Sequence, residues 1–191
     1  MRTKVKKLTS VILAAVMMLG ILTIAPLTVS AATYGDFEYT LEDDYTCTIT
    51  KYNGSAANVT IPSTIYGNKV CKIGEGVFEN NKNVQYIKVP QTVKVIQVGA
   101  FSYCKKLKKI DLPEYANEIQ DYAFAHSAIE NIVLPNGIIY LGKFLFYDCE
   151  NLKTVKIPNT VTCVRPYAFV YCTSLPVSYT HLRAHETGAY L

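Results

Sequence analysis

The residues of this sequence that could most readily do chemistry lie near its C-terminal end. His181 and His185 are four residues apart, and Glu186 follows the second histidine directly. On a helix, that spacing places both imidazoles on one face, as in many metal-binding histidine pairs. A zinc site needs at least three protein ligands, and no further ligand lies nearby. In an HExxH motif the glutamate follows the first histidine, so this string does not match and predicts no metal site.

Six cysteines are present, and three of them share a position, three residues after a phenylalanine: Cys104, Cys149 and Cys172. Residues that recur in stacked units form a column, and a free cysteine is a good small buried residue. We therefore predict structural thiols, although neighbours such as Cys149 and Cys172 would be close enough for a disulfide. The remaining cysteines share no spacing, and no CxxC occurs, so no zinc or redox motif is predicted: Cys47, Cys71 and Cys163.

The other titratable residues give no catalytic pattern. His126 occupies a turn where related segments have Tyr or Asp, and we expect it to be an exposed turn residue. Glu42-Asp43-Asp44 lacks the spaced ligands of a calcium loop and indicates an acidic hairpin turn. Neither a glycine-rich phosphate loop nor a nucleophile elbow is present. The sequence therefore predicts a protein that is not an enzyme and holds no cofactor and no metal.

Charge is concentrated at the start of the chain. Four of the 19 basic residues lie in the first seven positions, ahead of an apolar run from Leu8 to Leu27 and the small residues Ser30-Ala31-Ala32. This layout predicts a secretory signal peptide over residues 1–32, although the run is also about long enough for an uncleaved membrane anchor. From Thr33 onward, 15 basic and 15 acidic side chains balance. A neutral body argues against nucleic-acid binding, which needs clustered Lys and Arg.

Two residue types repeat with the same period. Apart from the first proline interval, both series advance by 22 or 23 residues: Pro62, Pro90, Pro113, Pro135 and Pro158, and Phe78, Phe101, Phe124, Phe146 and Phe169. Each unit opens with apolar residues at its first, fourth and sixth positions and then a proline, which favours a short strand over a helix. A unit this short cannot close a core alone, so stacked units must bury a continuous one.

The segment ahead of the repeats predicts a hairpin. Its apolar residues alternate with polar ones on both sides of the acidic turn: Phe37, Tyr39 and Leu41, then Tyr45, Cys47 and Ile49. Period-two alternation is typical of strands with one apolar face. We expect residues 33–55 to cover the open N-terminal end of the solenoid.

The pattern L-x-x-I-x-I-P, followed by V-x-x-I-G-x-x-A-F-x-x-C, resembles the BspA-type leucine-rich repeat of bacterial surface proteins over about residues 35–175. Departures are Gln97, Gln120 and Arg165 in place of glycine, and Phe144-Leu145-Phe146 in place of the Ala-Phe pair. The resemblance implies an extracellular, non-enzymatic protein that binds host proteins or other cells. We expect a β-rich leucine-rich-repeat solenoid: residues 56–175 as about five stacked coils of 22–23 residues with a short parallel sheet.

A binding surface is predicted on that sheet, because residues between the apolar positions of each strand point away from the core and repeats align them in rows. The candidate residues are Asn58, Thr60, Tyr86, Lys88, Lys109, Asp111, Asn131, Val133, Thr154 and Lys156. Tyr86 and Lys88 are the leading pair, since Tyr is favoured at interfaces. We expect a secreted or cell-surface adhesion module for an extracellular protein or glycan, which meets a membrane only through its signal peptide. Two other hypotheses stay open: a structural spacer for another domain, and a secreted enzyme with a downstream catalytic module.

The repeat register also explains the histidine-rich end. A new unit should begin at Leu175, but the sequence there lacks both the apolar spacing and the proline. The string "PVSYTHLRAHET" resembles a recurrent non-native tail at the ends of translated sequence assemblies. We therefore interpret residues 176–191 as an aberrant, non-native tail, with no structure of the repeat expected.

Overall fold

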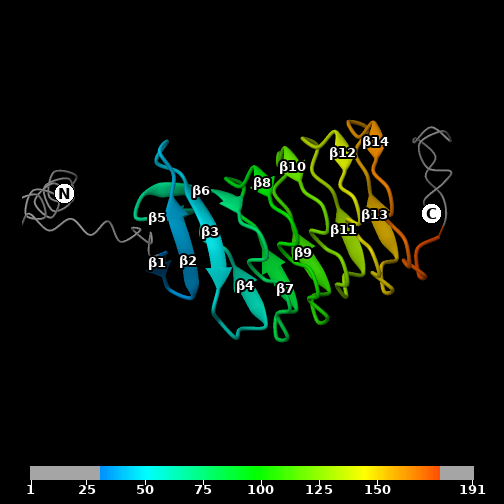
Figure 1. Ribbon diagram of the computed structural model, residues 1–191, viewed down its shortest axis with the longest axis horizontal. Helices are drawn as coiled ribbons and strands as arrows, with labels where there is room; N and C mark the ends of the chain where they lie inside the picture. The colour runs from blue at the N-terminus through cyan, green and yellow to red at the C-terminus, as the bar shows by residue number, and fades with distance from the viewer. Residues whose placement is uncertain (1–30, 177–191) are drawn as a thin grey trace, which may run out of the picture. The chain divides into compact units, whose positions relative to one another are not determined.

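The computed structural model describes residues 31–176, so all but the last two residues of the predicted signal peptide, the histidine pair and nearly all of the predicted tail lie outside the described residues. This part of the chain contains strands and turns but no helix (Figure 1). None of the described residues therefore forms a helix that could span a membrane. The strands are β1 (Ala32–Tyr34), β2 (Phe37–Leu41), β3 (Cys47–Tyr52), β4 (Asn58–Thr60), β5 (Thr64–Ile65), β6 (Asn68–Ile73), β7 (Tyr86–Lys88), β8 (Val95–Ile96), β9 (Lys109–Asp111), β10 (Glu118–Ile119), β11 (Asn131–Val133), β12 (Tyr140–Leu141), β13 (Thr154–Lys156) and β14 (Cys163–Val164).

The N-terminal hairpin forms from β2 and β3, which pair antiparallel, and β3 then pairs parallel with β6 of the first coil. A further strand, β1, pairs with β2 and was not predicted. The predicted alternation is wrong at two positions, because Leu41 is 53% exposed and Tyr45 is 63% exposed. Thr48 is buried instead, beside a register shift on β3, and its hydroxyl donates to Glu42 Oε1 at 2.6 Å. That hydrogen bond satisfies the buried hydroxyl, so the polar residue is tolerated.

Two lines of parallel strands run along the coils, whereas one sheet was predicted. The first line follows the apolar opening of each unit and contains β4-β7-β9 and β11-β13. The second follows the V-x-x-I segment of the repeat pattern and contains β6-β8-β10, continuous with the hairpin, and β12-β14. From coil two onward, the strands of this second line are two residues long. In β8, β10 and β12 the second residue is buried. Strands this short give no alternation for sequence analysis to detect.

From Pro90 onward, each repeated proline begins the turn that separates the two strand lines. The carbonyl of Pro90 accepts a hydrogen bond from the Val93 amide at 3.1 Å, and Pro158 does the same for Val161 at 3.1 Å. Just before Pro90, the Val89 amide still donates to the backbone carbonyl of Asp111 in the next coil at 2.9 Å. Proline has no amide hydrogen, so hydrogen bonding between coils stops there, as the sequence predicted.

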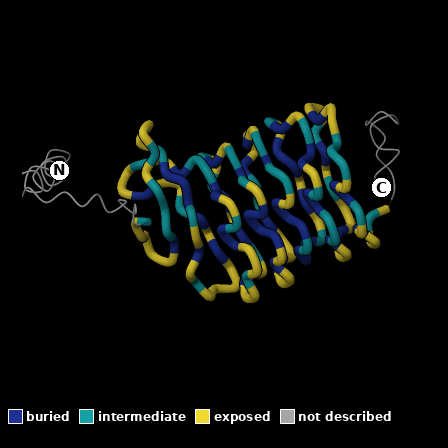
Figure 2. The backbone as a smooth tube through the Cα atoms, in the orientation of Figure 1, coloured by how far each residue is buried: buried dark blue, intermediate teal, exposed yellow. Residues whose placement is uncertain are grey.

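The core contains a continuous aromatic column along the solenoid axis. Successive phenylalanine rings stack with centroids 5.4–5.6 Å apart: Phe78, Phe101, Phe124, Phe146 and Phe169. Tyr52 of the hairpin continues the column at 4.9 Å from Phe78. The buried segments recur at the same place in successive coils (Figure 2). Nearest-neighbour stacking of this kind is what allows units of 22–23 residues to share one core.

Candidate binding face

The strand registers place the ten predicted residues in two parallel rows on the first strand line (Figure 1). Asn58, Tyr86 and Lys109 are aligned across β4, β7 and β9, and Asn131 is aligned with Thr154 across β11 and β13. The second row contains Thr60, Lys88 and Asp111, and then Val133 aligned with Lys156. Tyr86 and Asp111 are half-buried, and the other eight are exposed. The ladder is not continuous, because β9 and β11 belong to separate sheets.

A polar cluster forms where β7 meets β9. The Tyr86 hydroxyl donates to Asp111 Oδ2, and Lys109 Nζ lies 5.3 Å from the centroid of the Tyr86 ring. Lys109 Nζ is also 3.5 Å from Asp111 Oδ1. The hydrogen bond to Asp111 and partial desolvation raise the pKa of Tyr86 above its ordinary value. The phenol therefore stays protonated at neutral pH, and its ring is oriented along the sheet by neighbours on the next coil.

The face is hollowed beside this cluster. A depression of about 990 Å³ extends over β9, β11 and β13, and six of the ten predicted residues line it: Lys109, Asp111, Asn131, Val133, Thr154 and Lys156. Val133 presents an apolar side chain that is 63% exposed, and Thr154 donates to Asn131 Oδ1 at 2.6 Å. Charged, amide, hydroxyl and apolar groups thus surround one hollow. The predicted leading pair, Tyr86 and Lys88, is not among the residues that line it.

Sequence analysis missed the charged residues at the second position of three successive repeats, two of which, Lys108 and Glu130, line the hollow. Glu130 lines it, and the Glu130 carboxylate lies 2.8 Å from Lys153 Nζ of the next coil. The hydrogen bond and the charge of Lys153 hold the pKa of Glu130 below its ordinary value. Lys108, at the same position of the preceding unit, also lines the hollow. The repeat register contained the signal, because all three residues occupy the second position of their units.

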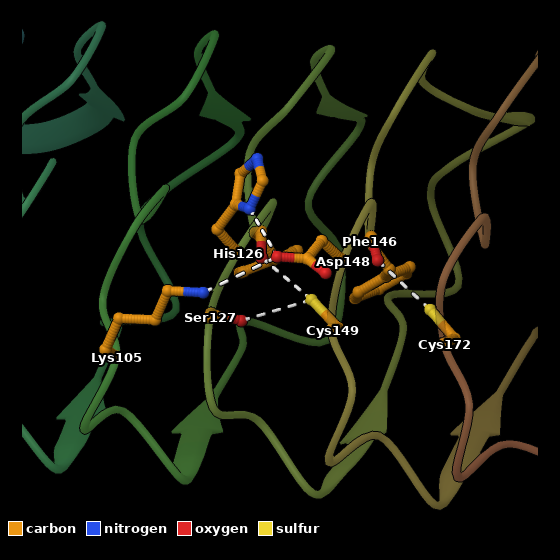
Figure 3. A network of polar contacts seen from close by, with 8 residues as sticks. Lys105, His126, Ser127, Phe146, Asp148, Cys149 and Cys172 are labelled. Carbon is orange, nitrogen blue, oxygen red and sulfur yellow. Dashed lines mark hydrogen bonds and ion pairs between the residues drawn. The ribbon is translucent and has the colours of Figure 1, made fainter.

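The cysteine column consists of buried free thiols, and Figure 3 shows two of them, Cys149 and Cys172. Each sulfur donates to the carbonyl of a phenylalanine in the preceding coils: Cys104 to Phe78 at 3.0 Å, Cys149 to Phe124 at 3.1 Å, and Cys172 to Phe146 at 3.1 Å. Desolvation raises the pKa of Cys104 and Cys172 to about 12 and that of Cys149 to about 11. A nucleophilic cysteine needs a lowered pKa, so these thiols serve packing. Cys149 and Cys172 are both free, and each has a carbonyl acceptor in place of a bridge.

The prediction for His126 is wrong, since its side chain is only 20% exposed. Its Nδ1 lies 2.7 Å from Asp148 Oδ2, and Lys105 Nζ lies 3.6 Å from the same oxygen (Figure 3). The imidazole also stacks on Tyr103 with centroids 4.1 Å apart. The turn conformation, with φ of 57°, directs the ring along the coil edge onto its neighbours. This histidine therefore joins adjacent coils.

The acidic turn uses its oxygens within the hairpin. Asp44 Oδ1 accepts hydrogen bonds from the Thr46 amide at 3.0 Å and the Thr46 hydroxyl at 2.7 Å. These bonds lower the pKa of Asp44. Within residues 31–176, no group of three or more His, Cys, Asp or Glu side chains is arranged to hold a metal ion.

The fold and the residue pattern define a class of protein, the leucine-rich-repeat solenoid. The sequence matches the BspA type leucine rich repeat region in six copies over residues 71–180, and the chain belongs to this family. The matched range starts within β6 and extends five residues, 176–180, into the segment that we interpret as a non-native tail. No curated protein matches this sequence.

Solved structures of bacterial leucine-rich-repeat proteins are similar to this chain. One, from T. pallidum, is 31% identical with a TM-score of 0.72, and the match covers 76% of this chain and 69% of that one. A leucine rich cell surface protein from Faecalibacterium prausnitzii is 30% identical with a TM-score of 0.57, covering 78% of this chain and 47% of that one. A third, from Bacteroides capillosus, is 28% identical with a TM-score of 0.59, and the match covers 66% of this chain and 97% of that one.

Proposed function

We propose that this chain is an extracellular binding module that attaches to a protein or glycan through its first strand line, without catalysis. The observation that carries the proposal is the hollow of about 990 Å³ over β9, β11 and β13. Recognition sites of this kind combine apolar contact with a few placed polar groups, and Val133, Asn131 and Thr154 provide both here.

Two observations support a location outside the cell. The basic and apolar start of the sequence has the layout of an export signal. The F. prausnitzii relative is described as a cell surface protein. A rigid repeat array presents many weak contacts at fixed spacing, which suits adhesion.

The experiment is a binding screen with the purified chain against extracellular-matrix proteins and bacterial glycans. For any ligand found, Val133→Glu replaces the apolar contact in the hollow with a charged side chain opposite Lys156 and should weaken the affinity at least about tenfold, or about 1.4 kcal/mol. Ile139→Glu is the matched control, because Ile139 is 59% exposed and does not line the hollow. It should bind like the unmodified chain.

A second pair of substitutions tests the N-terminal part of the face. Tyr86→Ala with Lys88→Glu changes the predicted leading pair without substituting any residue that lines the hollow, although it removes the hydroxyl that donates to Asp111. Weaker binding in this variant would extend the contact surface to β7, whereas unchanged binding would remove the leading pair from it. A screen in which no matrix protein or glycan binds would instead favour the structural-spacer hypothesis.

A further inference from the structure

A second surface feature lies away from the strand face, on the turns that precede the core phenylalanines. Two residues before each core phenylalanine the backbone is left-handed: Gly76 (φ 61°), Gly99 (φ 60°), Tyr122 (φ 58°), Phe144 (φ 55°) and Tyr167 (φ 63°). This conformation favours glycine, so the aromatic residues that occupy it in three successive coils have strained backbones. Their rings stack, with centroids 4.7 and 4.8 Å apart. An aromatic ladder therefore runs along three coils and stops at Tyr122.

The end of the ladder borders a hollow. Because the two preceding coils have glycine at this position, the stack of rings does not continue past Tyr122, and a depression of about 520 Å³ lies there. The rings of Tyr122 and Tyr103 line it, and these residues are 41% and 43% exposed. Gly76 and Gly99 also line it. The site thus offers an aromatic surface where a fourth flat group could continue the ladder.

Two carboxylates also line this hollow. Glu75 and Glu79 both line it, and neither forms an ion pair with any residue that the structure describes. A Cβ placed on Gly76 would lie 3.3 Å from Glu79 Oε2, so that carboxylate lies directly over the glycine. Aromatic rings and uncompensated carboxylates together favour a flat cation. A neutral sugar would leave both charges unpaired.

The same chain already contains such an arrangement. The guanidinium of Arg165 lies 4.0 Å from the centroid of the Tyr140 ring, and Arg165 Nη1 lies 3.6 Å from Asp121 Oδ1. Arginine is suited to this because its planar group stacks on aromatic faces and pairs with carboxylates at once. We propose that the hollow beside Tyr122 is a second binding site, which takes an arginine side chain of a partner protein. The guanidinium stacks on Tyr122 and pairs with Glu79.

The proposal is tested by NMR titration of the full chain with the peptide acetyl-Gly-Arg-Gly-amide. The matched probe replaces arginine by citrulline, which keeps the planar shape but has no charge. The arginine peptide should bind at least about fivefold more tightly and shift the resonances of Tyr122 and Gly99. Methyl glycosides serve as neutral competitors. Equal binding of the two peptides, or displacement of the arginine peptide by a glycoside, would overturn the assignment of a guanidinium.

Two variants locate the site. Tyr122→Gly restores the residue that the first two coils have at this position, so it fits the backbone, and Glu79→Gln removes one charge from an exposed carboxylate. Each should weaken the arginine peptide about fivefold or more. The matched controls are Tyr167→Gly, at the same position two coils away, and Glu150→Gln, and both should bind normally. If the Tyr122→Gly variant does not fold, the affinity of the Glu79→Gln variant for the arginine peptide still tests the proposal. Full binding by Glu79→Gln would contradict the proposal.

Discussion

The aromatic column provides the sharpest test of how the solenoid is stabilised. Phe124 is fully buried, and its ring stacks between Phe101 at 5.6 Å and Phe146 at 5.4 Å. Replacement by alanine leaves a cavity at the centre of the column, which costs about 3–5 kcal/mol for a core phenylalanine. That range already includes the loss of ring contacts, and losing two stacked pairs, each worth about 0.5–1.5 kcal/mol beyond burial, places this substitution in its upper part. We therefore expect Phe124→Ala to lower the free energy of unfolding by about 4–5 kcal/mol.

The measurement is urea denaturation of the whole chain, followed by tyrosine fluorescence and far-UV circular dichroism, since the chain has 15 Tyr and no Trp. Phe124→Leu is the matched control and should cost about 2 kcal/mol or less, because it keeps most of the buried volume. A loss below about 1 kcal/mol for Phe124→Ala, with an unchanged m-value, would refute the column as the source of stability. A smaller m-value would show that the coils on either side unfold separately.

Three further outcomes follow from the described contacts. At pH 8 a thiol reagent should label the exposed Cys163 rapidly and the four buried thiols only upon unfolding; fast labelling of all six would contradict the column of thiols. Lys153→Gln should return the lowered pKa of Glu130 toward its ordinary value in an NMR titration. Because the pKa is lowered in the folded chain, the stabilisation from this pair is present at neutral pH and is lost as the pH falls through the lowered value. Gly137→Ala should destabilise the chain by about 1–3 kcal/mol in the urea assay, since its Cβ would collide with the Ala116 carbonyl; an unchanged midpoint would show that the coils can separate.

Much of the fold could be predicted because a repeat gives many copies of the same physical constraint. The phenylalanines at intervals of 22–23 residues could form one core only if their coils stacked in register. The second strand line was missed because its strands have two residues each from coil two onward, too few to show a period. Strand β1 was missed because Ala32–Tyr34 is exposed throughout and is held by pairing with β2.

The site was partly predictable for the same reason. Equivalent positions such as Asn131 and Thr154 are aligned because parallel strands in register keep repeat positions together. The hollow could not be predicted, since it depends on side-chain sizes and on the break between β9 and β11. The position of His126 was also beyond sequence analysis, because a left-handed turn residue directs its side chain in a way that no pattern indicates.

The central claim is that an extracellular ligand occupies the hollow on the strand face. Its most direct test is lysine acetylation of the chain with and without a bound ligand, read by mass spectrometry. Lys109 and Lys156 line the hollow, whereas the exposed Lys143 does not. Ligand binding should protect Lys109 and Lys156 and leave the labelling of Lys143 unchanged. Protection of Lys143 with full labelling of the other two would place the ligand elsewhere and contradict the claim.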